Sequence, residues 1–168
     1  MNAEDIEPSS VIEVDYGTPD RPRTVAEMVT AGNYDHYASR IDNEHFPVTG
    51  KSVKYFKWKL FSGGCSSKEG IRRIKKSRWK PAEIEHTLVF GAAFPEIQLK
   101  HNIVCLGSAI LRGDNRGAPC LDGHGDKRGL ILAWNSGVWS DDCRFLAVRE
   151  ISATKFWFFK VCRRLKGL

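Results

Sequence analysis

Apolar and charged residues alternate most clearly over residues 51–61, in the stretch KSVKYFKWKLF. Successive side chains of a strand point to opposite faces of a sheet, so this stretch predicts a strand with one buried face. The core-facing set is Phe56, Trp58 and Leu60, and the outward set is Tyr55, Lys57, Lys59 and Phe61. The outward face is therefore expected to be cationic and aromatic.

Two other stretches carry Ser or Thr followed three residues later by Glu, which is the capping-box spacing at a helix N-terminus. They are Thr24 with Glu27 and Ser66 with Glu69. A proline, Pro81, suits the first turn of a further helix. The expected helices cover residues 24–31, 67–80 and 82–94.

The second half of the chain is more ambiguous. Residues 96–111 are apolar, and we expect a helix as far as Leu106 and then a strand. The glycine-rich residues 112–129 predict a loop. Strands are expected over 130–134 and 143–151, paired as a hairpin, and over 154–162. The order predicts an α+β fold, with an antiparallel sheet packed against two or three helices.

The length of 168 residues favours one globular domain, which we place at residues 24–168. Residues 1–23 contain three prolines and many charges and predict a disordered acidic arm. Residues 1–50 hold ten acids and three arginines, a net charge of −7, whereas residues 51–168 hold 23 bases and ten acids, a net charge of +13. This asymmetry indicates a basic binding face and an acidic arm that shields it or docks elsewhere.

The basic residues concentrate in residues 51–80, which hold eleven bases and the single acid Glu69. On the expected helix Arg72 and Lys76 are four residues apart, as are Lys76 and Lys80, and such like-charge pairs cost a few tenths of a kcal/mol each. A bound polyanion or anionic membrane would offset this repulsion. The predicted anion-binding residues, including the basic C-terminal tail, are Lys54, Lys57, Lys59, Arg72, Arg73, Lys75, Lys76, Arg78, Lys80, Arg163, Arg164 and Lys166.

Sequence patterns for catalysis or metal binding are weaker than the pattern of basic residues. The start lacks the apolar segment of a secretory signal, so the five cysteines are expected to be reduced thiols. The stretch CLDGHGD places Cys120, Asp122, His124 and Asp126 together, and Cys143 would complete a metal site there. No second metal-binding pair and no known nucleophile motif accompany it. We therefore expect no metal, no cofactor and no catalytic residue, with a small metal-dependent enzyme as the alternative.

The order of features suggests a family. A charged arm precedes KYFKWKLF, two helices follow, and the apolar NIVCLGSAI leads to a sheet built from the second half. Over roughly residues 50–165 this order resembles the matrix proteins of rhabdoviruses, in particular the plant-infecting cytoplasmic branch. The resemblance implies a structural viral protein that self-associates and bridges the nucleocapsid to an anionic membrane during assembly and budding.

The resemblance also implies partners and a location. The partners would be further copies of the chain, the viral nucleoprotein or ribonucleoprotein, the anionic membrane surface and RNA. The location would be the virion and host cytoplasm, peripheral to membranes and not secreted. The arm would mediate self-association through Ile6, Val11, Ile12 and Val14. The principal alternative is a sequence-nonspecific RNA-binding protein of the silencing-suppressor or capsid type.

Overall fold

The computed structural model describes residues 11–112 and 115–158. Its helices are α1 (Val25–Gly32), α2 (Ser67–Lys76), α3 (Ile84–Ala93) and α4 (Pro95–Gln98), and residues 153–158 are also helical. The strands are β1 (Val11–Asp15), β2 (Gly17–Thr18), β3 (Arg21–Pro22), β4 (His36–Tyr37), β5 (Val53–Ser62), β6 (Lys80–Pro81), β7 (Asn102–Val104), β8 (Ile110–Arg112), β9 (Asn115–His124), β10 (Lys127–Asn135) and β11 (Cys143–Ile151).

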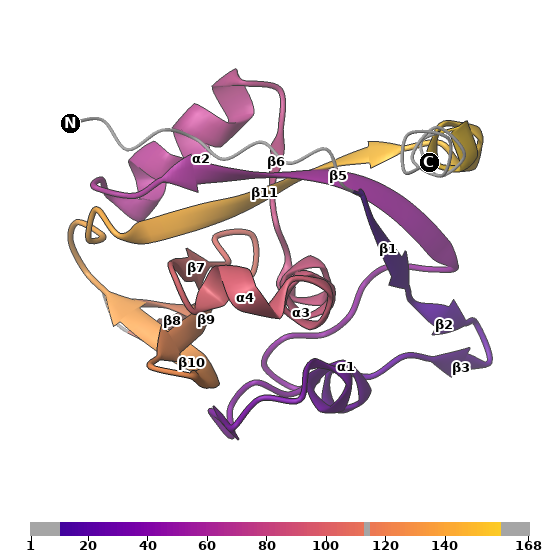
Figure 1. Cartoon of the computed structure of the whole chain (residues 1–168), viewed down its shortest axis with the longest axis horizontal. Coiled ribbons are helices and arrows are strands. Elements are labelled where there is room, and N and C mark those ends of the chain that lie inside the picture. Colours follow the sequence, from indigo (N-terminus) through magenta and orange to yellow (C-terminus); the bar gives the residue numbers. More distant parts are fainter. Residues whose placement is uncertain (1–10, 113–114, 159–168) are drawn as a thin grey trace.

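One large sheet organises the fold, with the strand order β1-β5-β11-β7-β9-β10-β4. Most pairs are antiparallel, and the β11–β7 and β10–β4 pairs are parallel. The long strand β11 lies between β5 on one side and β7 with β6 on the other. Figure 1 shows α2 on one side of β5 and β11, and α1, α3 and α4 on the other. The α+β fold class is thus confirmed.

The sheet buries apolar side chains on both faces. Beneath α3, the ring of Trp58 lies 4.6 Å from that of Phe90, in an edge-to-face arrangement, and Leu60 is fully buried in the same cluster. On the opposite face, Ile74 of α2 packs into a second cluster with Phe61 and Phe145. The core-facing side of β5 was predicted correctly. Phe61 was expected on the outward face, but it is 5% exposed because α2 covers that end of the strand.

The local capping signals predicted two helices correctly. Thr24 caps α1 through the Glu27 amide, and the Glu27 carboxylate accepts from the Thr24 amide in return. Ser66 caps α2 by accepting a hydrogen bond from the Glu69 amide. The second helix ends at Lys76, earlier than predicted, because the chain turns at Arg78, whose φ is 60°, and enters β6.

The predicted boundary of the arm is wrong in part. Residues within it form β1, which pairs antiparallel with β5 at the sheet edge. Ile12 and Val14 point into the main core and are 2% and 0% exposed, and Tyr16 follows at 4%. The folded domain therefore includes residues from Val11 onward, and the first ten residues lie outside the described part.

Residues 115–124 and 127–129 form paired strands where the sequence predicted a loop over 112–129. β9 and β10 make an antiparallel hairpin that turns at Gly125, where φ is +65°. Glycines occur in β9 because neighbours leave no room for a side chain. A Cβ at Gly117 would lie 3.0 Å from the Trp134 ring, and one at Gly123 would lie 2.5 Å from the Gln98 carbonyl oxygen.

Three other assignments in the second half need correction. The 96–111 segment contains the short helix α4 and strands β7 and β8 instead of a helix to Leu106. β10 and β11 do not pair with each other, because β7 and β9 separate them in the sheet. Residues 153–158 are helical instead of extended, and the remainder of the expected last strand lies outside the described residues.

Candidate functional site

A strongly basic stripe runs along α2. At 100° per residue, four cationic side chains fall on the same exposed side of the helix. These are Lys68, Arg72, Lys75 and Lys76, here called the α2 stripe. The opposite side of the helix, with Ile74 and Gly70, packs on the sheet. Lys68 was not among the predicted site residues, although its helical spacing from Arg72 is visible in the sequence.

Glu69 reduces the repulsion expected within this helix. Its carboxylate binds the Arg72 guanidinium at 2.7 and 2.8 Å and accepts from Arg73 Nε at 3.0 Å. These hydrogen bonds lower the pKa of Glu69 to about 2. Lys80 lies on β6, so it is not one helical turn beyond Lys76 as expected. Among the described residues, Lys68, Lys75 and Lys76 form no ion pair, and they are the cations of α2 left for an external anion.

Arg149 of β11 fixes the turn that follows α2. Its guanidinium donates to the carbonyls of Ser77 and Arg78 and lies 4.4 Å from the centre of the Trp79 ring. Sequence reasoning overlooked this residue, whose partners lie some 70 positions earlier. The turn thereby presents Arg78, which is exposed, beside the α2 stripe.

The three β5 lysines do not form one surface. Lys57 and Lys59 lie on the α2 side of the sheet, where Lys59 Nζ sits 5.0 Å from the Phe61 ring centre. Lys54 instead has the orientation of Phe56, on the other face, and pairs with Glu150 at 3.2 Å. The structure therefore separates Lys54 from the other predicted anion-binding residues of the strand.

Lys54 belongs to a pocket of about 680 Å³ that sequence reasoning did not find. Its walls come from the segment before α1, from β5 and β11, from α2 and from residues 80–86. The charged or polar lining residues are Tyr16, Lys54, Lys75, Lys80, Glu83, Glu85, His86, Arg116 and Glu150. Phe56, Ile71, Leu106 and Val148 contribute apolar surface. This volume lies within the range of about 300–1,000 Å³ typical of small-molecule sites.

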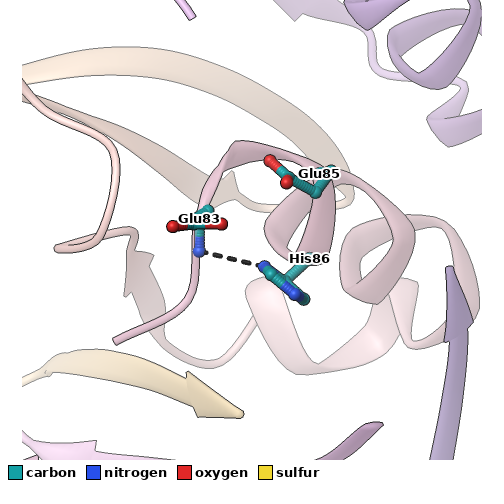
Figure 2. A group of neighbouring side chains, drawn as sticks. All are labelled: Glu83, Glu85 and His86. Atoms are coloured by element: carbon teal, nitrogen blue, oxygen red, sulfur yellow. Dashed lines mark hydrogen bonds between the residues drawn. The ribbon is translucent and has the colours of Figure 1, made fainter. Parts of the chain in front are cut away.

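His86 occupies the inner end of the pocket as a neutral ring. The Glu83 amide donates to Nδ1 at 3.1 Å (Figure 2). Nε2 therefore carries the proton and donates to the Tyr16 hydroxyl at 3.4 Å. Burial, assisted by the charges of Lys54 and Lys80, lowers the pKa of His86 to about 4. The hydroxyl hydrogen of Tyr16 is thereby directed away from the imidazole.

Two carboxyl groups lie beside this ring. Glu85 is 1% exposed, and its burial and the neighbouring carboxylate of Glu83 raise its pKa to about 7. Glu83, Glu85 and His86 place their oxygen and nitrogen ligand atoms within 4.8 Å of one another. The sequence signal was the Glu-x-Glu-His order at the start of a predicted helix.

This trio fits a metal ion poorly, because the only lone pair of the neutral imidazole is the Nδ1 pair, which already accepts from the Glu83 amide. The stretch considered for metal binding in the sequence is spread out. Cys120 is buried in the second core, whereas His124 and Asp126 are exposed at the hairpin end. Cys143 is buried in the same core as Cys120.

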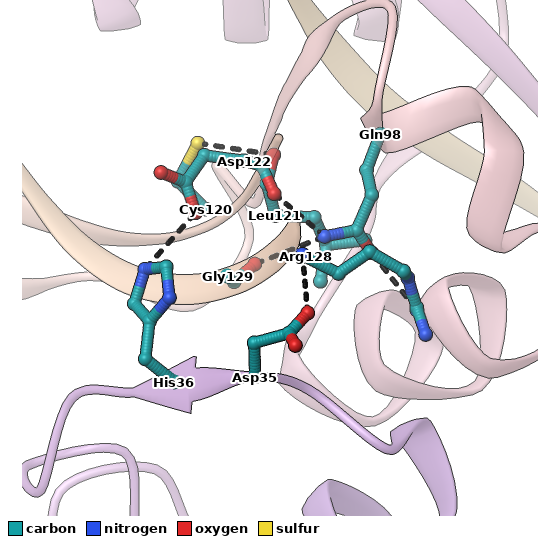
Figure 3. A network of polar contacts seen from close by, with 8 residues as sticks. All are labelled: Asp35, His36, Gln98, Cys120, Leu121, Asp122, Arg128 and Gly129. Carbon is teal, nitrogen blue, oxygen red and sulfur yellow. Dashed lines mark hydrogen bonds and ion pairs between the residues drawn. The ribbon is translucent and has the colours of Figure 1, made fainter. Parts of the chain in front are cut away.

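Arg128 makes a separate polar network that ties four segments together. It donates to the main-chain carbonyls of Gly32 at 2.7 Å and Gly91 at 2.6 Å, and to the Gln98 side chain at 3.0 Å. Figure 3 shows Gln98 and Asp35 gathered around it, and Gln98 in turn donates to the Asp122 carbonyl. These contacts are internal to the fold, so we regard Arg128 as structural.

The residues predicted to mediate self-association are not gathered on an exposed surface of the described structure. Ile12 and Val14 are core residues, Val11 is half-buried in β1, and Ile6 lies outside the described residues. Ile12 and Val14 therefore cannot dock on a neighbouring copy without leaving the core. The predicted tail residues Arg163, Arg164 and Lys166 also lie outside the described part.

Comparison of the chain with protein-family models, curated proteins and solved structures gives no match. Among the described residues, none of the helices has the length and hydrophobicity needed to cross a bilayer.

Proposed function

We propose that this chain is a non-enzymatic protein that binds nucleic acid, single-stranded RNA in the first instance, through contacts to phosphates. The observation that carries the proposal is the α2 stripe with the adjoining Arg78. Residues 68–78 hold six bases and one acid, a net charge of +5, and five of these cations lie on a helix that packs against the sheet. Phosphate contacts of this kind supply affinity without reading sequence.

Nucleic acid fits this helix better than a membrane surface. An interfacial helix inserts its apolar side among the lipids. In α2 that side is already packed, since Ile74 is 0% exposed and lies against the second core. Contact with the ribonucleoprotein, as a matrix protein would make, is compatible with the proposal, and the membrane contact and viral assembly role stay predictions.

The test is fluorescence anisotropy of a labelled single-stranded RNA over a series of NaCl concentrations. The variant K68E/K76E/R78N removes three exposed cations; asparagine is used at position 78 because it tolerates the positive φ there. Its control, R40E/K100E/K127N, makes the same change in net charge at exposed positions outside α2. The slope of log affinity against log salt should fall by about 2 for the α2 variant, since each phosphate contact contributes about 0.7 for single strands.

A control variant that loses as much affinity as the α2 variant would show that only net charge matters, and it would refute the proposed site. Flotation with anionic liposomes, run on the same proteins, tests the membrane alternative. If the wild type binds liposomes strongly but does not bind RNA, and the α2 variant loses the liposome binding, then the target of α2 is a membrane and not nucleic acid.

A further inference from the structure

We propose that the pocket beneath β6 binds a small phosphate monoester. This site is distinct from the α2 stripe, although Lys75 lies at their junction. Its inner wall is built from buried groups, with Tyr16, Glu85 and His86 exposed by 4%, 1% and 5%. The pocket is therefore part of the packed structure and not a hollow between surface side chains.

The balance of charge in the pocket favours an anion. Four bases and three acids line it, and Lys54 is already bound to Glu150 at 3.2 Å. The remaining cations are Lys75, Lys80 and Arg116, which form no ion pair with any residue in the described part. The remaining acids are Glu83 and Glu85, and burial raises the pKa of Glu85, which reduces the negative charge that this carboxyl carries at neutral pH. A dianionic ligand is the simplest partner for the three cations.

The hydrogen-bond donors favour phosphate over other anions. A guanidinium presents a planar fork that matches phosphate oxygens, and lysine ammonium groups add point charges. The Tyr16 hydroxyl supplies a further donor, because its oxygen already accepts from His86 Nε2 at 3.4 Å. Gly50 leaves the space that this ring fills, since a Cβ there would lie 1.9 Å from it.

The apolar part of the pocket indicates that the phosphate is attached to an organic group. Phe56, Ile71, Leu106 and Val148 line it beside the cations. Inorganic phosphate would leave this surface and most of the 680 Å³ unused. An ester with a ring-sized body would fill it and gain from apolar burial.

The test uses phenyl phosphate as the probe, with phenol and inorganic phosphate as comparisons, in isothermal titration calorimetry. Phenyl phosphate should bind more tightly than either. K80M and R116M should each weaken its binding by about ten- to a hundredfold, the value of a hydrogen bond to a charged group. Methionine is chosen because it retains the apolar stem of the side chain. Y16F should also weaken binding by about ten- to a hundredfold, because the Tyr16 hydroxyl would donate to a charged phosphate oxygen.

The matched control is K76E, which alters the same basic surface outside the pocket and should leave phenyl phosphate binding unchanged. Amide chemical shifts in ¹H–¹⁵N spectra should move around residues 80–86, which locates the ligand even where a variant folds poorly. The proposal is overturned if phenol binds as well as phenyl phosphate, if neither K80M nor R116M weakens binding, or if the wild type shows no binding at millimolar phenyl phosphate. The RNA measurements separate the two proposals, because K80M and R116M should retain RNA binding that K68E/K76E/R78N loses.

Discussion

The adjacent residues Glu85 and His86 should impose opposite pH dependences on stability that cancel in the wild type. Burial raises the pKa of Glu85 from 4.5 to about 7 and lowers that of His86 from 6.5 to about 4. As pH rises from 4.5 to 7, Glu85 ionises in the unfolded chain before it does so in the folded one, so stability falls. As pH falls from 6.5 to 4, His86 is protonated first in the unfolded chain, so stability falls in that direction too.

The magnitude follows from the differences between folded and unfolded pKa values. Each group changes the free energy of unfolding by about 1.4 kcal/mol per pH unit over its window, or about 3 kcal/mol in total. Between pH 4.5 and 6.5 the two slopes have opposite signs, so the wild type should show little net dependence from this pair. For E85Q, the free energy of unfolding should rise by about 3 kcal/mol as the pH rises from 4 to 6.5. For H86Q, it should fall by about 3 kcal/mol as the pH rises from 4.5 to 7.

The assay is urea unfolding followed by tryptophan fluorescence at half-unit pH steps, with unchanged m-values as a condition for comparison. Differences between two proteins at each pH remove the contributions of other groups, such as His101, whose pKa burial also lowers. The free energy of unfolding of the double variant E85Q/H86Q should again change little with pH. Parallel curves for the wild type and E85Q would refute the reasoning, because Glu85 would then titrate alike in the folded and unfolded chains.

Three further predictions concern the fold. I12A should lower the free energy of unfolding by about 2–5 kcal/mol, and deletion of residues 1–23 should cost more because it removes β1; both are measured by urea unfolding. R128M should cost about 2–5 kcal/mol, since it leaves two main-chain carbonyls without their donors, and R128K should not restore the loss because lysine lacks the guanidinium fork. In thermal melts C120S should be destabilised by about 1–3 kcal/mol and H124A by less than about 0.5 kcal/mol, since only the cysteine is buried; equal effects would contradict this difference.

The elements predicted correctly depend on local chemistry. The caps at Thr24 and Ser66 bond to residues three positions away, and the alternation in β5 follows from the geometry of a single strand. β9 was misassigned because its glycines resemble turn residues in the sequence. Their cause is the close approach of Trp134 and of the chain near Gln98, which only the folded structure shows.

The candidate sites show the same difference between contacts that are local in the sequence and contacts that are distant in it. The α2 stripe is contiguous in sequence, and most of its cations were predicted. The pocket draws on residues as distant as Tyr16 and Glu150, so no spacing rule connects them. The residues Glu83, Glu85 and His86 are close together in the sequence, but their order at the start of a predicted helix was not singled out.

The position of β11 has a consequence for folding during synthesis. β5 pairs with β11 from Tyr55↔Ile151 to Ser62↔Arg144. The ribosome therefore makes β11 about 80 to 100 residues after the β5 residues with which it pairs. At about 5–20 residues per second, the ribosome leaves β5 without that neighbour for roughly 4–20 seconds. During this interval the core around Trp58 lacks Leu146 and Val148, the two residues that β11 contributes to it. A nascent chain that pauses between β5 and β11 therefore carries an unpaired edge on β5 that can pair with another chain and aggregate, and the sheet is complete only once β11 has been made.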